Sequence, residues 1–237
     1  MSFRAGPDPN FPYLDVDCRY LFPPPEVWTD NIVAVGGNLS PGMLVSAYEQ
    51  GIFPWYNPGD PVIWQSPDPR LVIFPDELHV SRSMRKILDR GDFEIAFNRD
   101  FAAVMRGCAE TERPGQDGTW IDDDITDAYI EMHRLGLALS AEAYLDGELV
   151  GGCYGVRLHS AATTTHLFEG AFFGESMFSR KPNASKAAFL SLAEWLFDDG
   201  VAFIDCQVPT AHLRSLGGLE MSRRSFIALL KRVLGTD

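Results

Sequence analysis

The chain has 237 residues, of which 46% are hydrophobic and 22% are charged, and its formal net charge at pH 7 is −13. This composition is typical of a globular protein with a sizeable core, and the acidic balance argues against generic nucleic-acid binding, which needs many Lys and Arg contacts to phosphate. No apolar run approaches the ~20 residues of a membrane span and the N-terminus lacks a signal-peptide segment, so we expect a soluble, cytoplasmic protein that does not bind membranes.

The first 68 residues are rich in proline and aromatic side chains, and we expect them to form a small N-terminal domain. One regular element is predicted there, a short helix over residues 41–51 that begins after Ser40 and ends at Gly51. The remainder is interpreted as loops held by proline. The composition changes near residue 70, and residues 69–237 are expected to form a second, catalytic domain.

Regular periodicity predicts the elements of this second part. Strands are predicted at 93–98, 138–145, 148–158, 166–179 and 201–207. Helices are predicted at 99–110, 122–136 and 184–200, followed after residue 208 by a turn with a short helix and by a final helix. Asp146-Gly147 is a two-residue hairpin turn signal between the second and third of these strands. The order indicates an α+β protein with a mixed sheet. It resembles the acyl-CoA N-acyltransferase (GNAT) fold, a likeness that does not establish function.

Two carboxyl groups lie at apolar strand ends. Glu175 stands among phenylalanines in AFFGESMFS, and Asp205 precedes Gln207 at the end of VAFIDCQV. Because side chains alternate along a strand, Asp205 and Gln207 are expected on one face. A carboxylate beside an amide can hold and orient an amine nucleophile, so this strand end is a candidate reaction site.

Glu175 would line an apolar pocket walled by Phe173, with Phe172 on the reverse face unless the strand bulges at Gly174. An apolar pocket with a few polar groups at its rim is the usual form of a small-ligand site. The alternative is that Glu175 and Asp205 pair with Arg or Lys and only anchor the fold. The pattern of residues leaves both possibilities open.

Two further features bear on ligand binding. Trp55, Tyr56 and Trp64 lie in proline-stiffened loops, where rigid rings can stack on bases or fill a domain interface. A helix predicted within residues 79–90 carries four cations: Arg82, Arg85, Lys86 and Arg90. On charge pattern alone this helix is interpreted as a solvated face rather than a phosphate-binding surface.

Eight blocks of sequence carry a specific resemblance: VGGNLSPGMLVSAYEQGIFPWY, WQSPDPR, LHVSRSMRK, GTWI, LVGGCYGV, FFGESMFS, NASKAAF and IDCQVPTAHLRSLGG. From Val33 to Leu230 the chain resembles the leucyl/phenylalanyl-tRNA–protein transferases. The resemblance implies an enzyme that moves Leu, Phe or Met from aminoacyl-tRNA to the N-terminal Arg or Lys of an acceptor protein. That step forms a peptide bond and marks the acceptor for N-degron degradation. No cofactor or metal ion is implied, and we expect a monomer.

The resemblance also implies roles for individual residues. Asp205 and Gln207 would activate the incoming α-amine, and Glu175 would orient the 3′ end of the donor or its amino group. The terminal adenosine would be held, or the site shaped, by Tyr48, Trp55, Trp120 and Tyr129. The pocket for the donor side chain would be lined by Cys153, Phe172, Phe173, Phe189 and Ile204. The acceptor-stem phosphates would meet the cations Arg82, Arg85 and Lys86.

Two alternatives remain beside this interpretation. A GNAT-type acyl-CoA N-acyltransferase would need a Gly-rich pyrophosphate loop opening a helix, and SRKPNASKAAF has the cations without the glycines. The second alternative is a tRNA-binding module without catalytic activity. The presence of Glu175, Asp205 and Gln207 argues against it. His159 and His166 lie in an extended segment, and the four cysteines are scattered, so neither set indicates a metal site.

Overall fold

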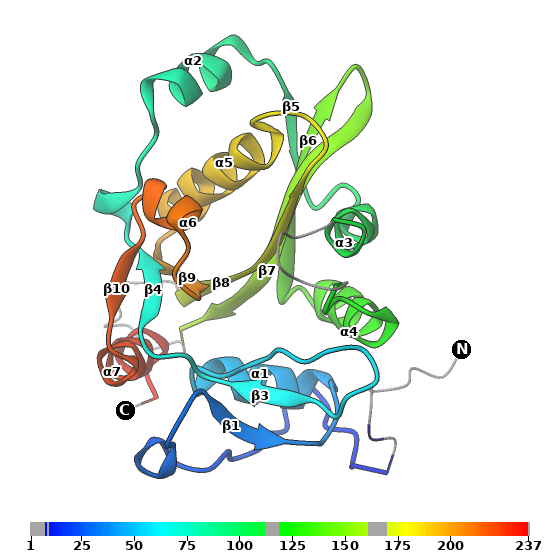
Figure 1. The fold of residues 1–237 in the computed structure, drawn as a ribbon, viewed down its shortest axis with the longest axis vertical. Coiled ribbons are helices and arrows are strands. Elements are labelled where there is room, and N and C mark those ends of the chain that lie inside the picture. Colours follow the sequence, from blue (N-terminus) through cyan, green and yellow to red (C-terminus); the bar gives the residue numbers. More distant parts are fainter. Residues whose placement is uncertain (1–7, 9, 112–118, 161–169, 237) are drawn as a thin grey trace.

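A computed structural model describes residues 8, 10–111, 119–160 and 170–236, and Figure 1 shows how their helices and strands are arranged. In this part of the chain the strands form two sheets. The smaller has three strands in the order β1-β3-β2, and the larger has seven in the order β10-β4-β9-β8-β7-β6-β5.

The strands of the small sheet precede those of the large sheet in the sequence. The small sheet is made of β1 (Ile32–Val35), β2 (Phe53–Pro54) and β3 (Ile63–Gln65). The large sheet is made of β4 (Arg70–Ile73), β5 (Glu94–Phe97), β6 (Ala138–Leu145), β7 (Glu148–His159), β8 (Gly170–Ser179), β9 (Val201–Gln207) and β10 (Leu219–Met221). The α-helices are α1 (Pro41–Glu49), α2 (Arg82–Arg90), α3 (Phe101–Ala109), α4 (Asp123–Arg134), α5 (Ala184–Asp198), α6 (Ala211–Ser215) and α7 (Arg223–Leu234). Two short 3₁₀ turns lie at Pro25–Val27 and Pro75–Glu77.

Local capping chemistry sets where several helices begin. The Asp100 side chain accepts a hydrogen bond from the Ala103 N–H at 2.9 Å, which satisfies a free donor at the start of α3. Ser81 and Asp122 accept in the same way at the starts of α2 and α4. None of the helices in the described ranges combines the length and the apolar character that a membrane crossing requires.

The predicted hairpin between β6 and β7 is confirmed. Asp146 and Gly147 both have positive φ, 52° and 82°, the backbone that a tight two-residue turn between antiparallel strands demands. β8 begins at Gly170, so the part of the predicted strand over 166–169 lies outside the described residues, as does His166.

The interpretation of the proline-rich region as loops with one helix is wrong in part, because three strands flank the helix there. β4 and β10 of the large sheet were not predicted either. All five have only two to four residues, too few for side-chain alternation to be visible in the sequence. Pro54 is tolerated because β2 lies at the edge of its sheet, where a missing N–H breaks no ladder.

The order of strands in the large sheet confirms the predicted α+β fold with a mixed sheet. Strands β5 to β8 form an antiparallel meander, and α5 then carries the chain over to β9, which lies parallel to β8. The parallel pairing ends where Phe173 lies opposite Asp205. Beyond that point β8 remains paired with β7 and β9 remains paired with β4, so β8 and β9 diverge.

Each face of the large sheet is covered by helices. One face packs against α5 and α2, and its core includes Phe172 and Ile204. The other face packs against α1, α3, α4 and α7, and its core includes Phe173 and Phe203 (Figure 1). Side chains of the small sheet belong to this second core. The chain passes from the small sheet to the large one between β3 and β4, and the domain division at residue 68 stays a prediction.

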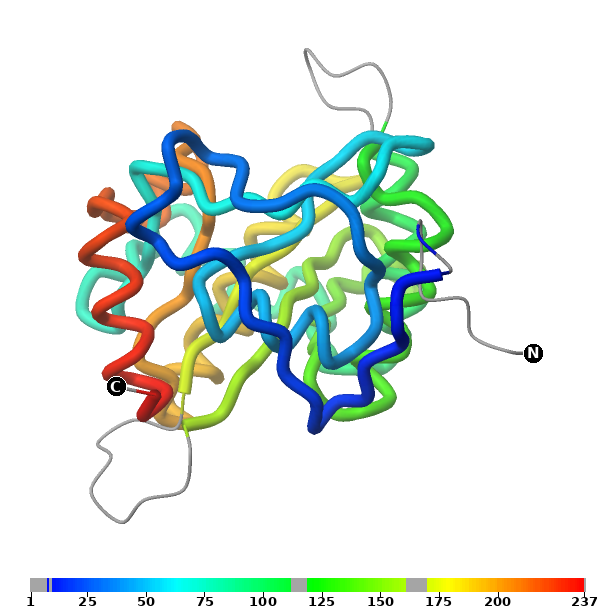
Figure 2. The backbone as a smooth tube through the Cα atoms, turned by 90° about the horizontal axis from the view of Figure 1, so that it is seen from below, coloured from blue at the N-terminus to red at the C-terminus, as the bar shows by residue number. Residues whose placement is uncertain are grey.

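The N-terminal stretch runs along α1, as the blue segment of Figure 2 shows. The Leu14 and Tyr20 amides donate to the hydroxyls of Ser40 and Ser46, at 3.1 and 2.8 Å. Gly42 permits this close approach, because a Cβ there would lie 2.4 Å from a backbone carbonyl oxygen of the stretch. The stretch therefore fixes α1, whose Tyr48 reaches the site described next.

Candidate active site

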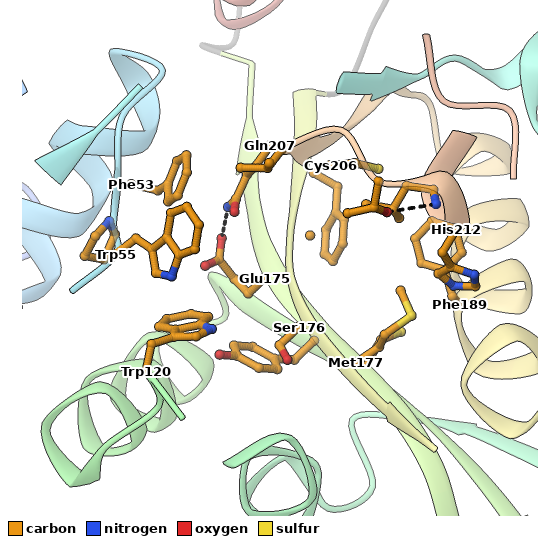
Figure 3. A pocket seen from close by; sticks show the side chains of 18 residues that line it. Phe53, Trp55, Trp120, Glu175, Ser176, Met177, Phe189, Cys206, Gln207 and His212 are labelled. Atoms are coloured by element: carbon orange, nitrogen blue, oxygen red, sulfur yellow. Dashed lines mark hydrogen bonds between the residues drawn. The ribbon is translucent and has the colours of Figure 1, made fainter. Parts of the chain in front are cut away.

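A cavity opens where β8 and β9 diverge. Its volume is about 400 Å³, within the usual range for small-molecule sites. Figure 3 shows two unlike ends. At one end Trp55 and Trp120 stand beside Glu175 and Gln207, and at the other the side chains are mainly apolar. Met177, Phe189 and His212 line that end. Cys153, Phe172 and Leu213 also line the cavity and belong to one hydrophobic cluster with Met177 and Phe189.

A β-bulge places Glu175 in this cavity. Tyr154 of β7 pairs with Ser176 and Gly155 pairs with Gly174, so Glu175 is an extra residue in β8. The extra residue reverses the alternation of side chains along β8, so Met177 shares a face with Phe172, and both line the cavity with Glu175. The condition stated from the sequence, a bulge at Gly174, is met.

A second bulge turns Gln207 toward Glu175. Leu71 of β4 pairs with Gln207 and Val72 pairs with Asp205, so Cys206 is the extra residue of β9. Gln207 itself has a φ of 61°, in the left-handed region that residues other than glycine seldom adopt. Side-chain alternation therefore breaks down at this strand end, and the cavity receives Cys206 and Gln207 but not Asp205.

Glu175 is held by three neighbouring side chains. Gln207 Nε2 donates to Glu175 Oε1 at 2.9 Å, and the Tyr129 hydroxyl donates to Oε2 at 3.2 Å. The Tyr129 hydroxyl is in turn hydrogen-bonded to that of Tyr48. Burial raises the pKa of both phenols, so both stay protonated and able to donate. The network leaves Glu175 fixed at the cavity wall.

The protonation of Glu175 is balanced near neutral pH. Burial raises the pKa of its carboxyl to about 7, while the hydrogen bonds from the tyrosines act in the opposite direction. Among the described residues no Arg or Lys forms an ion pair with it. Ion pairing therefore does not account for Glu175 within the described residues, and its part in a reaction stays a prediction.

Asp205 has the opposite environment. Its side chain is fully buried and pairs with the equally buried Arg70, with Nε to Oδ1 at 2.8 Å and Nη2 to Oδ2 at 2.6 Å. Asp205 Oδ1 also accepts the backbone N–H of Gln207 at 2.9 Å. Of the two possibilities left open by the sequence, ion pairing applies to Asp205, and its activation of an amine stays a prediction.

The other predicted residues divide by position. Five of those assigned to substrate binding line the cavity: Trp55, Trp120, Cys153, Phe172 and Phe189. Four do not line it: Tyr48, Tyr129, Phe173 and Ile204. Their roles at the substrate site stay predictions. The two tyrosines lie behind Glu175 instead. Phe173 packs in the opposite core, because side chains alternate along β8 and its neighbour Phe172 faces the cavity. Ile204 is enclosed beneath α5.

Some residues of the site were not predicted. Phe53 lines the aromatic end, and Met177, Cys206, His212 and Leu213 line the remainder. Tyr56 and Trp64 are buried, at 3% and 1% exposed, so of the three aromatic residues in the proline-rich loops only Trp55 reaches the cavity.

Arg70 is also a residue that the sequence did not assign. A signal for it exists, since Arg70 is the one charge in RLVIF and Asp205 is the one charge in VAFIDC. Two lone opposite charges in buried strands predict a pair, because an unpaired charge there is strongly unfavourable.

The basic helix α2 packs on α5 at the edge of the molecule (Figure 1). Met84 is its buried anchor, while Arg82, Arg85 and Lys86 are exposed. Arg85 pairs with Glu194 of α5 at 3.0 Å, with both side chains partly in solvent. Contact with tRNA stays a prediction.

No cluster of three or more His, Cys, Asp or Glu that could hold a metal ion occurs in residues 8, 10–111, 119–160 and 170–236. The cavity instead offers a carboxyl group, an amide and aromatic rings. That set can bind an apolar group and a flat ring, and can orient and deprotonate a nucleophile between them.

Comparison with solved structures yields remote likenesses. A GCN5-related N-acetyltransferase from Kribbella flavida is 13% identical, with a TM-score of 0.40, and the match covers 77% of this chain and 62% of that one. Similarity at this level carries no argument about activity.

Comparison of sequences is far more specific. A family model described as leucyl/phenylalanyl-tRNA protein transferase matches residues 72–231, and the model of its N-terminal domain matches 37–68. Relatives named leucyl/phenylalanyl-tRNA–protein transferase include one from Myxococcus xanthus, 48% identical over 90% of this chain and 88% of its own. Another, from Nitrosospira multiformis, is 49% identical over 94% and 92%. A third, from Anaeromyxobacter sp. strain K, is 48% identical over 98% and 91%. The chain therefore belongs to the leucyl/phenylalanyl-tRNA protein transferase family.

Proposed function

We propose that this protein is a cytoplasmic, monomeric aminoacyltransferase. It moves Leu, Phe or Met from aminoacyl-tRNA to the N-terminal Arg or Lys of acceptor proteins and so marks them for N-degron degradation. Family membership supports the activity, and one structural observation carries the mechanism. A carboxyl group whose pKa lies near 7 faces a cavity with an apolar end and an aromatic end.

The two ends of the cavity match the two parts of an aminoacyl-adenosine. The apolar end, with Cys153, Phe172 and Phe189, takes the donor side chain by excluding water from it. The aromatic end, with Trp55 and Trp120, takes the terminal adenine, and stacking of one base on such rings contributes about 1–3 kcal/mol. The ester bond then lies between them, beside Glu175 and Gln207 (Figure 3).

The reaction is attack of the acceptor's α-amine on this ester. A bond forms between the amine nitrogen and the carbonyl carbon, the bond from that carbon to the ribose oxygen breaks, and the proton lost by the amine finally resides on the tRNA hydroxyl. Glu175, when ionised, accepts the proton of the amine. Gln207 donates its Nε2 hydrogen to Glu175, which leaves its amide oxygen to orient the incoming amine.

A donor comparison tests this proposal. Purified protein is given Leu-, Phe- or Met-tRNA, or acetyl-CoA, together with a peptide that begins with Arg or Lys. A matched peptide with an acetylated N-terminus is the control. Transfer from aminoacyl-tRNA to the free amine alone is expected. Acetyl transfer would establish the GNAT-type alternative, and binding of tRNA without transfer would establish the silent module.

The exposed cations of α2 are proposed to contact acceptor-stem phosphates. The double change Arg82→Glu and Lys86→Glu is expected to weaken tRNA binding and to flatten the dependence of log affinity on log salt by roughly 2, since two phosphate contacts are lost. Affinity is measured over a salt series. The matched control reverses two exposed cations of α7, Arg224 and Lys231, and should leave that slope unchanged. If the slope of log affinity against log salt were equal in the wild-type protein, the α2 variant and the α7 variant, α2 would not contact the phosphates.

A further inference from the structure

We propose that Arg70 is a positioning residue of the transfer reaction. Through the Asp205 carboxylate it fixes the backbone of Gln207, and thereby holds the Gln207 amide against Glu175 at the cavity wall. The inference rests on the proposed function for its catalytic meaning, although the physical chain of contacts can be tested without it.

The first step of the chain is the ion pair itself. Arg70 and Asp205 have no exposed side-chain surface, and the guanidinium binds the carboxylate with two hydrogen bonds, Nε to Oδ1 at 2.8 Å and Nη2 to Oδ2 at 2.6 Å. A fork of this kind fixes the plane of the carboxylate as well as its place. A lysine ammonium would supply the charge without the plane.

Aromatic rings hold the guanidinium in turn. Its central carbon lies 4.9 Å from the ring centre of Phe53 and 4.5 Å from that of Phe226. Phe53 belongs to β2 and lines the cavity, while Phe226 belongs to α7. Arg70 Nη1 has no hydrogen-bond partner in the described part of the chain, so Asp205 and these rings are the contacts that place the group.

The second step runs from Asp205 to Gln207. Oδ1, the oxygen that accepts from Arg70 Nε, also accepts the Gln207 N–H at 2.9 Å. Gln207 has a positive φ of 61°, a backbone state that an L residue holds only when its surroundings enforce it. The carboxylate supplies that constraint, because rotation of the Gln207 peptide would break the charge-assisted hydrogen bond of the Gln207 N–H.

The third step reaches the cavity. With its backbone in this state, Gln207 directs Nε2 to Glu175 Oε1 at 2.9 Å, and both residues line the cavity. Arg70 and Asp205 do not line it. Arg70 therefore affects the reacting groups only through Asp205 and Gln207. A small displacement of its guanidinium would displace Gln207 as well.

A double-mutant cycle separates this role from a purely structural one. Arg70→Lys, Gln207→Ala and the combined variant are compared with the wild-type protein by kcat per folded molecule. Arg70→Lys alone is expected to lower kcat by about 10- to 100-fold, the effect of a misplaced reacting group. Its effect on KM for aminoacyl-tRNA should stay within about twofold, because the two ends of the cavity are intact. In the Gln207→Ala background the same substitution is expected to change kcat by no more than about twofold.

Arg157→Met is the matched control for loss of a buried arginine. Arg157 lies on β7 with its side chain 8% exposed, pairs with Asp199 at 2.6 Å and does not line the cavity. It should lower stability and leave kcat per folded molecule unchanged. Equal losses of kcat from Arg70→Lys in both backgrounds, or no loss in either, would overturn the inference.

One readout does not depend on catalysis. In ¹⁵N NMR spectra, Arg70→Lys should shift the backbone and side-chain amide signals of Gln207 and speed exchange of its backbone N–H, whereas Arg157→Met should do neither. Unchanged Gln207 signals in Arg70→Lys would show that Arg70 does not position Gln207, even if the enzyme is active. Shifted signals in a protein that transfers nothing would instead uphold the chain and refute the proposed function.

Discussion

Glu175→Gln is expected to lower kcat for aminoacyl transfer by about 10²- to 10⁴-fold, the usual contribution of a general base. Glutamine keeps the size of the side chain and can still bond with Gln207 and Tyr129, so the cavity should stay intact. What it lacks is the ability to take the proton of the attacking amine. Steady-state kinetics with Phe-tRNA and an N-terminal Arg peptide measure the change.

The pH profile distinguishes a base from an orienting group. Burial raises the pKa of Glu175 to about 7, so the ionised form that accepts a proton prevails only above that pH. In the wild-type protein, kcat/KM should rise with pH through 7. In Glu175→Gln the rise of kcat/KM through pH 7 should disappear. The rise due to deprotonation of the peptide amine, near pH ~8, should remain.

Stability should depend on pH through the same group. The folded pKa of Glu175 lies above its model-peptide value of 4.5, so the folded state binds more protons between those two pH values. The free energy of unfolding therefore has its full contribution from Glu175 below pH 4.5 and loses it as pH rises through 7. Glu175→Gln should remove this slope, which denaturant titrations at several pH values would measure.

Glu142→Gln provides the matched control. Glu142 of β6 is also a fully buried carboxyl group, and it accepts the Ser140 hydroxyl at 2.6 Å away from the cavity. Its replacement should leave kcat and the pH limb near 7 in place. A wild-type pH profile in Glu175→Gln, or a loss below about tenfold, would show that Glu175 orients substrate without taking a proton.

The large-scale fold could be predicted because its elements are long and each carries its own signal. The β6–β7 hairpin has a turn dipeptide, and α5 has an apolar stripe that ends before Gly200. Placing Phe172 in the same pocket as Glu175 required one further condition, the bulge at Gly174. The glycine made that bulge a natural expectation, because a residue without Cβ tolerates the bend.

The orientation of Asp205 and Gln207 could not be predicted, because it depends on a register shift between two strands that are far apart in sequence. Cys206 becomes the extra residue only when β9 pairs with β4, a strand too short to recognise. The same holds for Tyr48 and Tyr129, which read as helix residues and meet behind Glu175 only after α1 and α4 pack together.

Asp205→Asn is expected to lower the free energy of unfolding by about 3–5 kcal/mol, a large share of the ~5–15 kcal/mol typical of a folded protein. The reason is that Arg70 would keep its charge in an interior from which water is excluded, with only a neutral amide to face it. Urea denaturation measures the change. Asp199→Asn is the matched control, since Asp199 is 54% exposed and its pairing with Arg157 should contribute no more than about 1 kcal/mol.

The paired replacement of Arg70 by Met and Asp205 by Leu separates stability from catalysis. Apolar residues of similar volume often replace a buried ion pair without loss, so most of the stability lost in Asp205→Asn should return. Activity should not return with it, because the Gln207 N–H then has no carboxylate to hold it. Recovery of both stability and kcat would show that Asp205 only anchors the fold. Recovery of stability with kcat still lowered by about 10- to 100-fold is the expected result, since correct placement of the amine is what Asp205 secures.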